Sequence, residues 1–390
     1  MTEQNTIEFS IFLIFTGAAL FATMALYARQ AMLVGYIFLG ILLGPWGLSW
    51  LSDPVMVKEI SHIGIIFLLY LLGLDLFPQQ LWKMLGEALQ ITLVSSAIFC
   101  ATGIFIAWLT GFSLHDGALI GIVMMFSSTI IGLKLLPTTI LHHRHTGQII
   151  ISVLLIQDLI AIIVLLLLQG YGKGENLAMD IGYQLLMLPI LGLIAYLLER
   201  FILIKLIEKF DQIHEYIFLL AIAWCMGMSE LATYMGLSHE IGAFVAGVTL
   251  ASNPIAYFIT ERLKPLRDFF LVIFFFSLGA GFNIHNINEI IFPAVLLAIF
   301  VVIFKPLIFS MLLQHAGEKQ YVSREVGFRL GQISEFSLLI AVLAVDSAYT
   351  GELIANLIQL TTLLTFVISS YIIVMNYPTP IAVSDKLRRD

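Results

Sequence analysis

Apolar runs of about 20 residues recur along nearly the whole chain, separated by short stretches rich in glycine, proline, asparagine or charged residues. A helix of about 20 apolar residues is long enough to cross the hydrocarbon core of a bilayer. The pattern therefore predicts an all-α membrane protein with thirteen transmembrane helices. We place them near residues 7–27, 31–49, 58–76, 86–110, 116–136, 147–169, 178–200, 213–235, 238–254, 266–283, 288–313, 324–346 and 350–374.

Composition supports this class. The chain is 60% hydrophobic and only 12% charged, whereas a soluble protein carries about 25% charged residues. We expect one membrane domain over residues 1–390, because no stretch of the chain has the composition of a soluble domain. Cys100 and Cys225 lie in apolar runs and predict neither a disulfide framework nor a zinc site. The acidic, polar start lacks the features of a cleaved signal peptide, so the first apolar run is expected to stay as a span.

Basic residues are distributed unequally between the two sets of predicted loops. One set contains Arg29, Lys83, Arg144, Arg200, Lys205, Lys209, Arg262, Lys264, Arg267, Lys319 and Arg324, and the tail adds Lys386, Arg388 and Arg389. The opposite loops contain only Lys58 and Lys173. Because basic loops stay cytoplasmic, we expect a cell (inner) membrane protein with its N-terminus outside and its C-terminus inside.

The chain also repeats itself weakly. Two short motifs recur at an offset near 207 residues, pairing 35–45 with 241–251 and 63–76 with 271–284. Seven spans separate the copies, so the copies have opposite orientations in the membrane. Inverted repeats of this kind are typical of secondary transporters. We predict repeats over about 7–169 and 213–374, linked by the span at 178–200.

The pair Gln157-Asp158 interrupts the apolar run 151–168 near its middle. A carboxylate at that depth costs roughly 2.5–3.5 kcal/mol on insertion scales. Helix packing requires no acid there, so Asp158 indicates a proton or cation site. The alternative is a buried acid in a structural ion pair.

Two further spans carry polar residues at similar depth. Ser127, Ser128 and Thr129 interrupt the fifth span, and the 207-residue offset leads to Gln332 and Glu335 in the twelfth. Transporters place ion sites where helices break at mid-membrane, so we expect a broken helix at each position. The alternative for the hydroxyls is bonding to their own helix or to a neighbour.

Lys305 lies within the eleventh span and precedes Pro306, which limits local helical bonding. An intramembrane lysine needs a partner or a water-filled cavity. We expect a buried pair with Asp158 or Glu335, and snorkelling towards the cytoplasmic interface is the alternative.

His142, His143 and His145 form a cytoplasmic cluster with Arg144. Histidine titrates near physiological pH, so a pH sensor is one interpretation, and a solvated loop is the favoured one. The spacing predicts no specific metal site, and no metal is expected beyond the transported cation.

Several runs along the chain together resemble the monovalent cation:proton antiporter superfamily, and most of all its Kef-type potassium efflux branch. They are, in order, GYIFLGILLGPWGL, GIIFLLYLLGLDLFPQQLWK, SST, LLIQDLIAI, LSHEIGAFVAGVTLA, FFFSLGAGFNI and GQISEF. The resemblance implies thirteen spans in two inverted repeats with crossing broken helices, a core domain, a dimerisation domain and a homodimer. It assigns ion binding to Asp158 with Gln157.

The same resemblance places the broken helices at the spans with Ser127–Thr129 and Gly331–Phe336, and matches the family's core lysine to Lys305. Kef proteins continue into a cytoplasmic nucleotide-binding domain, which we do not expect in a chain ending at Asp390. Their acidic gating loop is here the mostly basic TERLKPLRD at 260–268. A separate cytoplasmic regulatory subunit is therefore an open alternative.

These features predict a secondary antiporter that exchanges K⁺ for H⁺ by alternating access, both ions competing for Asp158. We expect the hydroxyls of Ser127, Ser128 and Thr129 and nearby backbone carbonyl groups to help bind the cation. Na⁺/H⁺ exchange is the first alternative, and a cation channel or a sensing membrane subunit is the second. No HExxH or serine nucleophile motif indicates an enzyme. We expect no cofactor and no nucleic acid, and membrane lipid as a partner.

The basic-loop bias generates a topology prediction. A reporter fused after Asp390 should be cytoplasmic, and one fused at the N-terminus should be external, because lysine and arginine resist translocation. Paired phosphatase and fluorescent-protein fusions measure this. An external C-terminus would overturn the count of thirteen.

Overall fold

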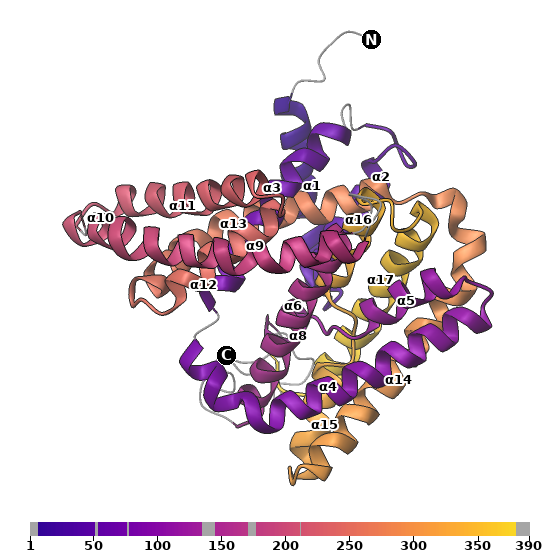
Figure 1. Cartoon of the computed structure of the whole chain (residues 1–390). Helices are drawn as coiled ribbons and strands as arrows, with labels where there is room; N and C mark the ends of the chain where they lie inside the picture. Colours follow the sequence, from indigo (N-terminus) through magenta and orange to yellow (C-terminus); the bar gives the residue numbers. More distant parts are fainter. Residues whose placement is uncertain are drawn as a thin grey trace. The chain divides into compact units, whose positions relative to one another are not determined.

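The computed structural model describes residues 7–50, 54–75, 78–134, 145–170, 177–210 and 212–379. Within these ranges the chain is almost entirely helical (Figure 1). The helices are α1 Ile7–Tyr27, α2 Met32–Leu43, α3 Pro54–Asp75, α4 Pro78–Leu109, α5 Leu114–Met124, α6 Thr129–Lys134, α8 His145–Gly170, α9 Leu177–Leu198, α10 Ile204–Lys209, α11 His214–Tyr234, α12 His239–Ala251, α13 Ile255–Gly281, α14 Ile287–His315, α15 Gln320–Arg329, α16 Glu335–Asp346 and α17 Glu352–Asn376. A π-helical turn η1, Glu199–Leu203, joins α9 to α10, and a 3₁₀ turn η2, Ile284–Asn286, precedes α14.

Every apolar segment expected from the sequence coincides with a helix or with two consecutive helices. In the described part of the chain, seven segments are long and apolar enough to cross a membrane by length and hydropathy. They are Glu8–Tyr27, Ala88–Leu109, Leu114–Gly132, His145–Leu168, His214–Tyr234, Ile284–His315 and Glu352–Asn376. The all-helical class is thus confirmed, and the count of thirteen crossings stays a prediction.

The chain divides into two compact units, each built from segments that are distant in the sequence. Unit 1 comprises Met1–Phe15, Gly40–Trp82 and Leu166–Gly281. Unit 2 comprises Thr16–Leu39, Lys83–Leu165 and Phe282–Asp390. All of the expected site residues belong to unit 2.

In unit 1, α3 packs against α12 and α13, and α12 also packs against α11. The crossing of α3 and α12 depends on two glycines that face each other. A side chain at Gly247 would collide with the backbone of Tyr70 and Leu74, and one at Gly73 with the backbone of Phe244. Small residues at such crossings let helix backbones approach closely inside a membrane, where van der Waals packing holds helices together.

A second crossing of the same kind lies in unit 1. A side chain at Gly40 in α2 would collide with the backbone of Phe276, Gly279 and Ala280 in α13. Gly40 lies 207 residues before Gly247, so the two crossings occupy corresponding positions of the sequence motifs that repeat.

Unit 2 is organised around α14, which packs against α15 and α17, while α16 packs against α17 and α5. The rings of Phe99 in α4 and Phe309 in α14 meet edge to face with centroids 5.3 Å apart. These two rings belong to a buried apolar cluster with Ile91, Val153 and Leu313. The cluster fixes α4, α8 and α14 beside the site described below.

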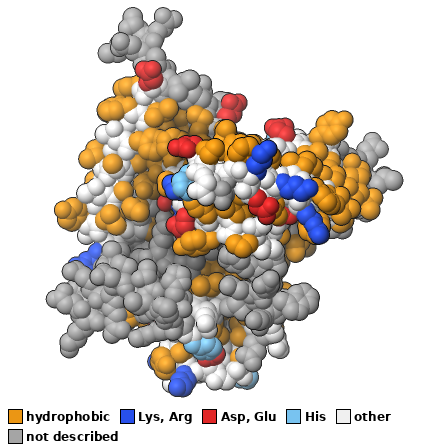
Figure 2. All heavy atoms as spheres, turned by 90° about the vertical axis from the view of Figure 1, so that its left-hand side faces the viewer, with side chains coloured by type: hydrophobic (Ala, Val, Ile, Leu, Met, Phe, Trp, Pro, Cys, Tyr) orange, Lys and Arg blue, Asp and Glu red, His pale blue; other side chains and the backbone are white. Residues whose placement is uncertain are grey.

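Large apolar side chains are abundant on the surface, and in Figure 2 hydrophobic side chains cover most of the coloured face while charged ones form small groups. Along α14 exposed residues recur every three or four positions, at Phe292, Leu296, Ile299, Ile303, Leu307 and Met311. Water would penalise such a surface, whereas lipid tails solvate it. The molecule is a multi-pass membrane protein.

The glycine crossing in unit 1 is testable by one methyl group. We expect Gly247→Ala to lower the thermal midpoint of the purified protein by at least about 5 °C, because the new Cβ meets backbone that cannot move aside. Gly227→Ala in α11 is the matched control, since a Cβ there meets nothing within 4 Å. Equal midpoints for the two variants in a detergent melting assay would contradict the close crossing.

Candidate functional site

Two helices in unit 2 are interrupted in their middle. Residues 125–128 separate α5 from α6, and residues 330–334 separate α15 from α16; Figure 1 labels these four helices. Each interruption leaves the carbonyl groups of one half-helix and the N–H groups of the next without helical partners. The first kind of end carries partial negative charge and the second kind partial positive charge. Buried ends of both kinds need partners from elsewhere in the chain.

The two interruptions lie against each other. The Ser127 hydroxyl donates to the Leu330 carbonyl oxygen at 2.9 Å. The Gln332 amide donates to the Ser128 carbonyl oxygen at 3.4 Å. These bonds join residues more than 200 positions apart. The fold thus brings together the two polar interruptions that the 207-residue repeat of the sequence relates to each other.

Lys305 ties the carbonyl-rich ends of both breaks. Its side chain is 1% exposed, and Nζ donates to the carbonyl oxygens of Phe126 at 2.6 Å and Gln332 at 3.0 Å. Nζ also lies 5.2 Å from the ring centroid of Phe99, a cation–π distance. The ammonium thus neutralises two half-helix ends at once.

The expected ion pair of Lys305 with Asp158 or Glu335 is therefore wrong. Backbone carbonyl groups, concentrated where two helices stop, occupy the positions around Nζ that we assigned to a carboxylate. The snorkelling alternative is also excluded, because the side chain is buried rather than extended towards an interface.

Glu335 has the complementary position at the N–H-rich ends. It is the first residue of α16, and its Oε1 accepts from the Thr129 hydroxyl and from the Ile130 N–H at 3.2 Å. Those donors begin α6, so one carboxylate lies at the positive ends of two half-helices. Its side chain is buried, with 4% exposed.

Gln157 fixes the first break by two hydrogen bonds. Its Oε1 accepts from the Ser127 N–H at 2.9 Å, and its Nε2 donates to the Met125 carbonyl oxygen at 3.0 Å. The carboxamide replaces the helical partners that the interruption removes. Gln157 therefore positions the backbone of the break, and its own carbonyl oxygen is already engaged.

Asp158 is the residue of α8 that follows Gln157, and it is 3% exposed. No hydrogen-bond donor in the described ranges of the chain reaches its carboxylate. Its neighbour Gln157 bonds to Ser127, and Glu335 bonds to Thr129 and Ile130, so both acids lie beside the first break. The predicted alternative, a structural ion pair of Asp158, is absent from this part of the chain, and the acid is buried with its charge unbalanced.

The Ser127 and Ser128 hydroxyls of the first break already have hydrogen-bond partners within the protein. Ser127 bonds across to the second break, and the Ser128 hydroxyl accepts from the Ile131 N–H at 3.1 Å, which caps α6. The alternative weighed for these residues, bonding to their own or a neighbouring helix, describes both side chains. The Ser128 carbonyl oxygen also has donors, from Gln332 Nε2 and the Gly132 N–H, so of these two residues only the Ser127 carbonyl group has no donor among the described residues.

Sequence reasoning missed the helix that supports the second break. In α17, the Thr365 hydroxyl accepts from the Ile333 N–H at 3.2 Å, and the Ser369 hydroxyl donates to Gln332 Oε1 at 3.0 Å. Gln332 in turn donates to the Arg329 carbonyl oxygen at 2.8 Å. The signal was present as a run of threonine and serine within the last apolar span.

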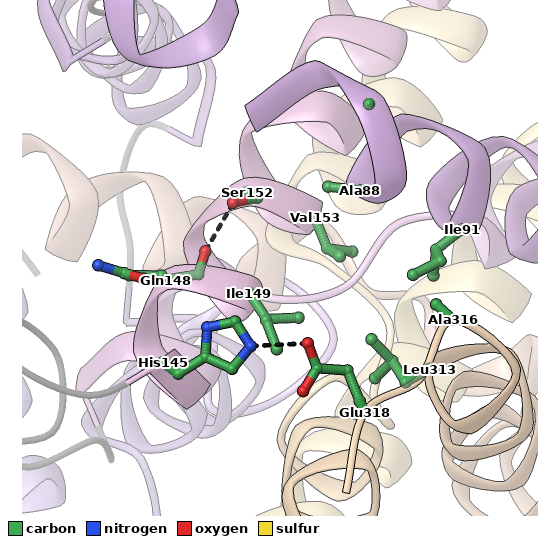
Figure 3. Close-up of a pocket in the computed structure, with 11 residues that line it drawn as sticks. Ala88, Ile91, His145, Gln148, Ile149, Ser152, Val153, Leu313, Ala316 and Glu318 are labelled. Carbon is green, nitrogen blue, oxygen red and sulfur yellow. Dashed lines mark hydrogen bonds and ion pairs between the residues drawn. The ribbon is translucent and has the colours of Figure 1, made fainter. Parts of the chain in front are cut away.

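His142 and His143 lie outside the described residues. His145 is the first residue of α8, and its Nε2 lies 2.6 Å from Glu318 Oε1. The pair borders a pocket of about 400 Å³ between α4, α8 and the end of α14, with Ile91, Val153 and Leu313 in its lining (Figure 3). None of the break residues, nor Asp158, lines this pocket.

The family model and the curated relatives that match this chain are all described as cation exchangers or antiporters. A family model described as "Sodium/hydrogen exchanger, transmembrane" matches residues 11–375. The K(+) efflux antiporter 5 of Arabidopsis thaliana is 32% identical over 331 residues, which are 80% of this chain and 56% of that protein. The K(+) efflux antiporter 4 of the same plant is 31% identical over 326 residues, with 80% and 54% covered. The chain spans a little over half the length of these curated relatives.

A solved structure shares the fold. The sodium proton antiporter MjNhaP1 of Methanocaldococcus jannaschii superposes with a TM-score of 0.70, covering 93% of this chain and 94% of that one. At 17% sequence identity, this likeness concerns the fold alone.

The bonds of Lys305 predict a stability effect. We expect Lys305→Met to lower the thermal midpoint by at least about 5 °C, because two buried carbonyl groups lose their donor at about 1–3 kcal/mol each. Lys319→Met is the control, since that lysine is exposed. A melting assay in which Lys305→Met matches the control would show that the ammonium does not hold the breaks.

Proposed function

This chain belongs to the monovalent cation:proton antiporter superfamily, in its Kef-type branch, and on that premise we propose that it exchanges K⁺ for H⁺ by alternating access. The observation that carries the proposal is the isolated, buried Asp158 carboxylate beside two crossed helix breaks. The family membership supplies the class of reaction, and the site supplies a group able to bind both ions.

A single carboxylate serves both substrates in this proposal. When Asp158 is ionised, it attracts a dehydrated cation, and when it is protonated, it does not. Burial favours the neutral form and a nearby cation favours the charged form, so proton and cation compete. Alternating access of the site to the two sides of the membrane then couples their fluxes.

The remaining ligands of the cation come from the first break. Gln157 and Ser128 hold residues 125–128 in a non-helical conformation, in which the carbonyl groups of Met125, Phe126 and Ser128 have donors and that of Ser127 has none among the described residues. Transporters coordinate cations with unwound carbonyl groups of this kind. In this proposal Gln157 positions ligands for the ion that Asp158 attracts.

Charge counting supports electroneutral exchange. Gln157 is neutral, and its carboxamide makes two bonds that a second acid could not make together, because one of them requires an N–H donor. Lys305 already neutralises two half-helix ends and is committed to them throughout the cycle. One cation and one proton then alternate on Asp158 without net movement of charge.

K⁺ is the preferred cation in this proposal, since the two Arabidopsis relatives carry K⁺ in their names. Na⁺ is the runner-up, because the family model and the shared fold are named for sodium/hydrogen exchange. A channel or a sensing subunit is less favoured, because channels use several weak sites along an open path.

We extend the proposal to the architecture and setting. The corresponding glycine crossings at Gly40 and Gly247 support two inverted repeats, and the basic-loop bias supports a cytoplasmic C-terminus in the inner membrane. Thirteen spans, a homodimer surrounded by lipid, and control by a separate cytoplasmic subunit complete it.

The decisive variant is Asp158→Asn. In proteoliposomes with a pH-sensitive dye, we expect it to abolish cation-dependent proton exchange with K⁺, Rb⁺, Na⁺ and Li⁺ alike, because the amide cannot alternate between charged and neutral forms. The control is Asp268→Asn, which removes an exposed carboxylate that pairs with Arg267 on α13. This control should exchange at the wild-type rate.

Exchange by Asp158→Asn at the wild-type rate would refute the proposed mechanism. The same vesicles under a clamped potential report charge movement, and the rate of wild-type exchange should not respond to the potential. A rate that follows the potential would refute electroneutrality and make Lys305 a proton carrier.

A further inference from the structure

One oxygen of Glu335 has no role in the contacts described so far. Oε1 bonds to Thr129 and Ile130, whereas Oε2 is fully buried and no donor among the described residues reaches it. Buried polar atoms of native proteins are nearly always satisfied, and an exception indicates a missing water, an ion or a functional strain. The side chain is 4% exposed, so bulk water does not satisfy this oxygen.

Burying a carboxylate oxygen without a partner is energetically costly. An isolated carboxylate in a low-dielectric interior is strongly penalised and persists only with a partner of opposite charge or a proton. Lys305 does not supply direct contact, because its ammonium donates to the carbonyl groups of Phe126 and Gln332. The partner of Oε2 is therefore not part of the described chain.

The position of the second acid points to the transported ion. Glu335 holds the start of α6 through Thr129 and Ile130, and Gln157 holds the other end of the same break through Ser127. Asp158 is the residue after Gln157 on α8, so both acids lie beside the same break. A cation bound at Asp158 consequently lies within the field of Glu335 as well.

Charge balance gives the second acid a definite state. With Glu335 ionised, its charge offsets that of Lys305, and the buried site carries one uncompensated negative charge on Asp158. A proton or a monovalent cation on Asp158 then brings the whole site to neutrality in either loaded state. This arrangement keeps the exchange of one cation for one proton electroneutral with two acids present.

We propose that Glu335 is a cation ligand of the transport site: it stays ionised through the cycle, and its Oε2 joins Asp158 in coordinating the monovalent cation. This inference rests on the proposed antiport at Asp158 and adds a second carboxylate to it. Glu335 thereby does two things, holding the α6 start with Oε1 and binding the ion with Oε2.

A structural role alone makes a different prediction for Glu335→Gln. The glutamine carbonyl oxygen can accept both bonds that Oε1 accepts, from Thr129 and Ile130, so the half-helix starts remain held. Only the negative charge and the ligand oxygen are lost. The variant therefore separates ion binding from support of the fold.

The experiment measures equilibrium binding of ⁸⁶Rb⁺ and ²²Na⁺ to the purified full chain across a pH series. We expect Glu335→Gln to raise the half-saturating cation concentration at least about tenfold, which corresponds to about 1.4 kcal/mol. When each protein is assayed at the same multiple of its own half-saturating cation concentration, the pH below which cation binding is lost should move to lower pH, because a neighbouring negative charge no longer favours the proton on Asp158. Glu352→Gln, an exposed acid at the start of α17, is the matched control and should bind as wild type.

The outcomes separate the two proposals. Wild-type binding that Asp158→Asn abolishes and Glu335→Gln leaves unchanged would overturn the ligand role of Glu335 and leave the antiport proposal standing. Absence of binding in the wild type, or binding that Asp158→Asn does not affect, would overturn the antiport proposal itself. Where Glu335→Gln does not yield folded protein, Glu335→Asp decides, since it keeps the charge but withdraws the oxygen: weakened binding supports the ligand role and unchanged binding overturns it.

Discussion

A helix that stops inside a membrane leaves backbone groups that neither water nor lipid can satisfy, and unit 2 is arranged around that constraint. Lys305 donates hydrogen bonds to carbonyl groups just beyond the ends of α5 and α15. Glu335, the first residue of α16, accepts a hydrogen bond from an N–H group at the start of α6. Opposite charges thus lie at opposite half-helix ends, in the order that the helix dipole favours. The cross-bond from Ser127 to Leu330 holds the two breaks in register.

The proposed function rests on the buried acidic groups that these contacts do not engage. Once the half-helix ends are neutralised, Asp158 and the second oxygen of Glu335 are the buried acidic groups of the described site that no protein donor reaches. In the proposed function, the site uses this charge to bind a monovalent cation and a proton in turn. The surrounding amides and hydroxyls, led by Gln157, are engaged with backbone and hold the shape of the site.

Much of this was predictable from the sequence, and the failures share one cause. Apolar length located the long helices of the described chain but not the short α10, and a single offset linked the break at Ser127–Thr129 to the one at Glu335. The partners of Lys305 were wrong, because a backbone carbonyl group has no letter in the sequence and only the fold shows where carbonyl groups converge. The place of Gln157 beside the ion stays a prediction, and the sequence did not show that its carboxamide bonds to the backbone of the first break. The glycine crossings were visible only as motifs until α3 and α12 were seen to meet there.

Anomalous scattering from crystals soaked in Tl⁺ or Rb⁺ at alkaline pH tests the central claim most directly. These heavy cations mimic K⁺ and reveal their own positions. We predict one peak within coordination distance of the Asp158 carboxylate, with Glu335 Oε2 and the carbonyl group of Ser127 around it, and loss of the peak at acidic pH. A peak elsewhere in unit 2, or one that persists unchanged when Asp158 is replaced by asparagine, would contradict the account.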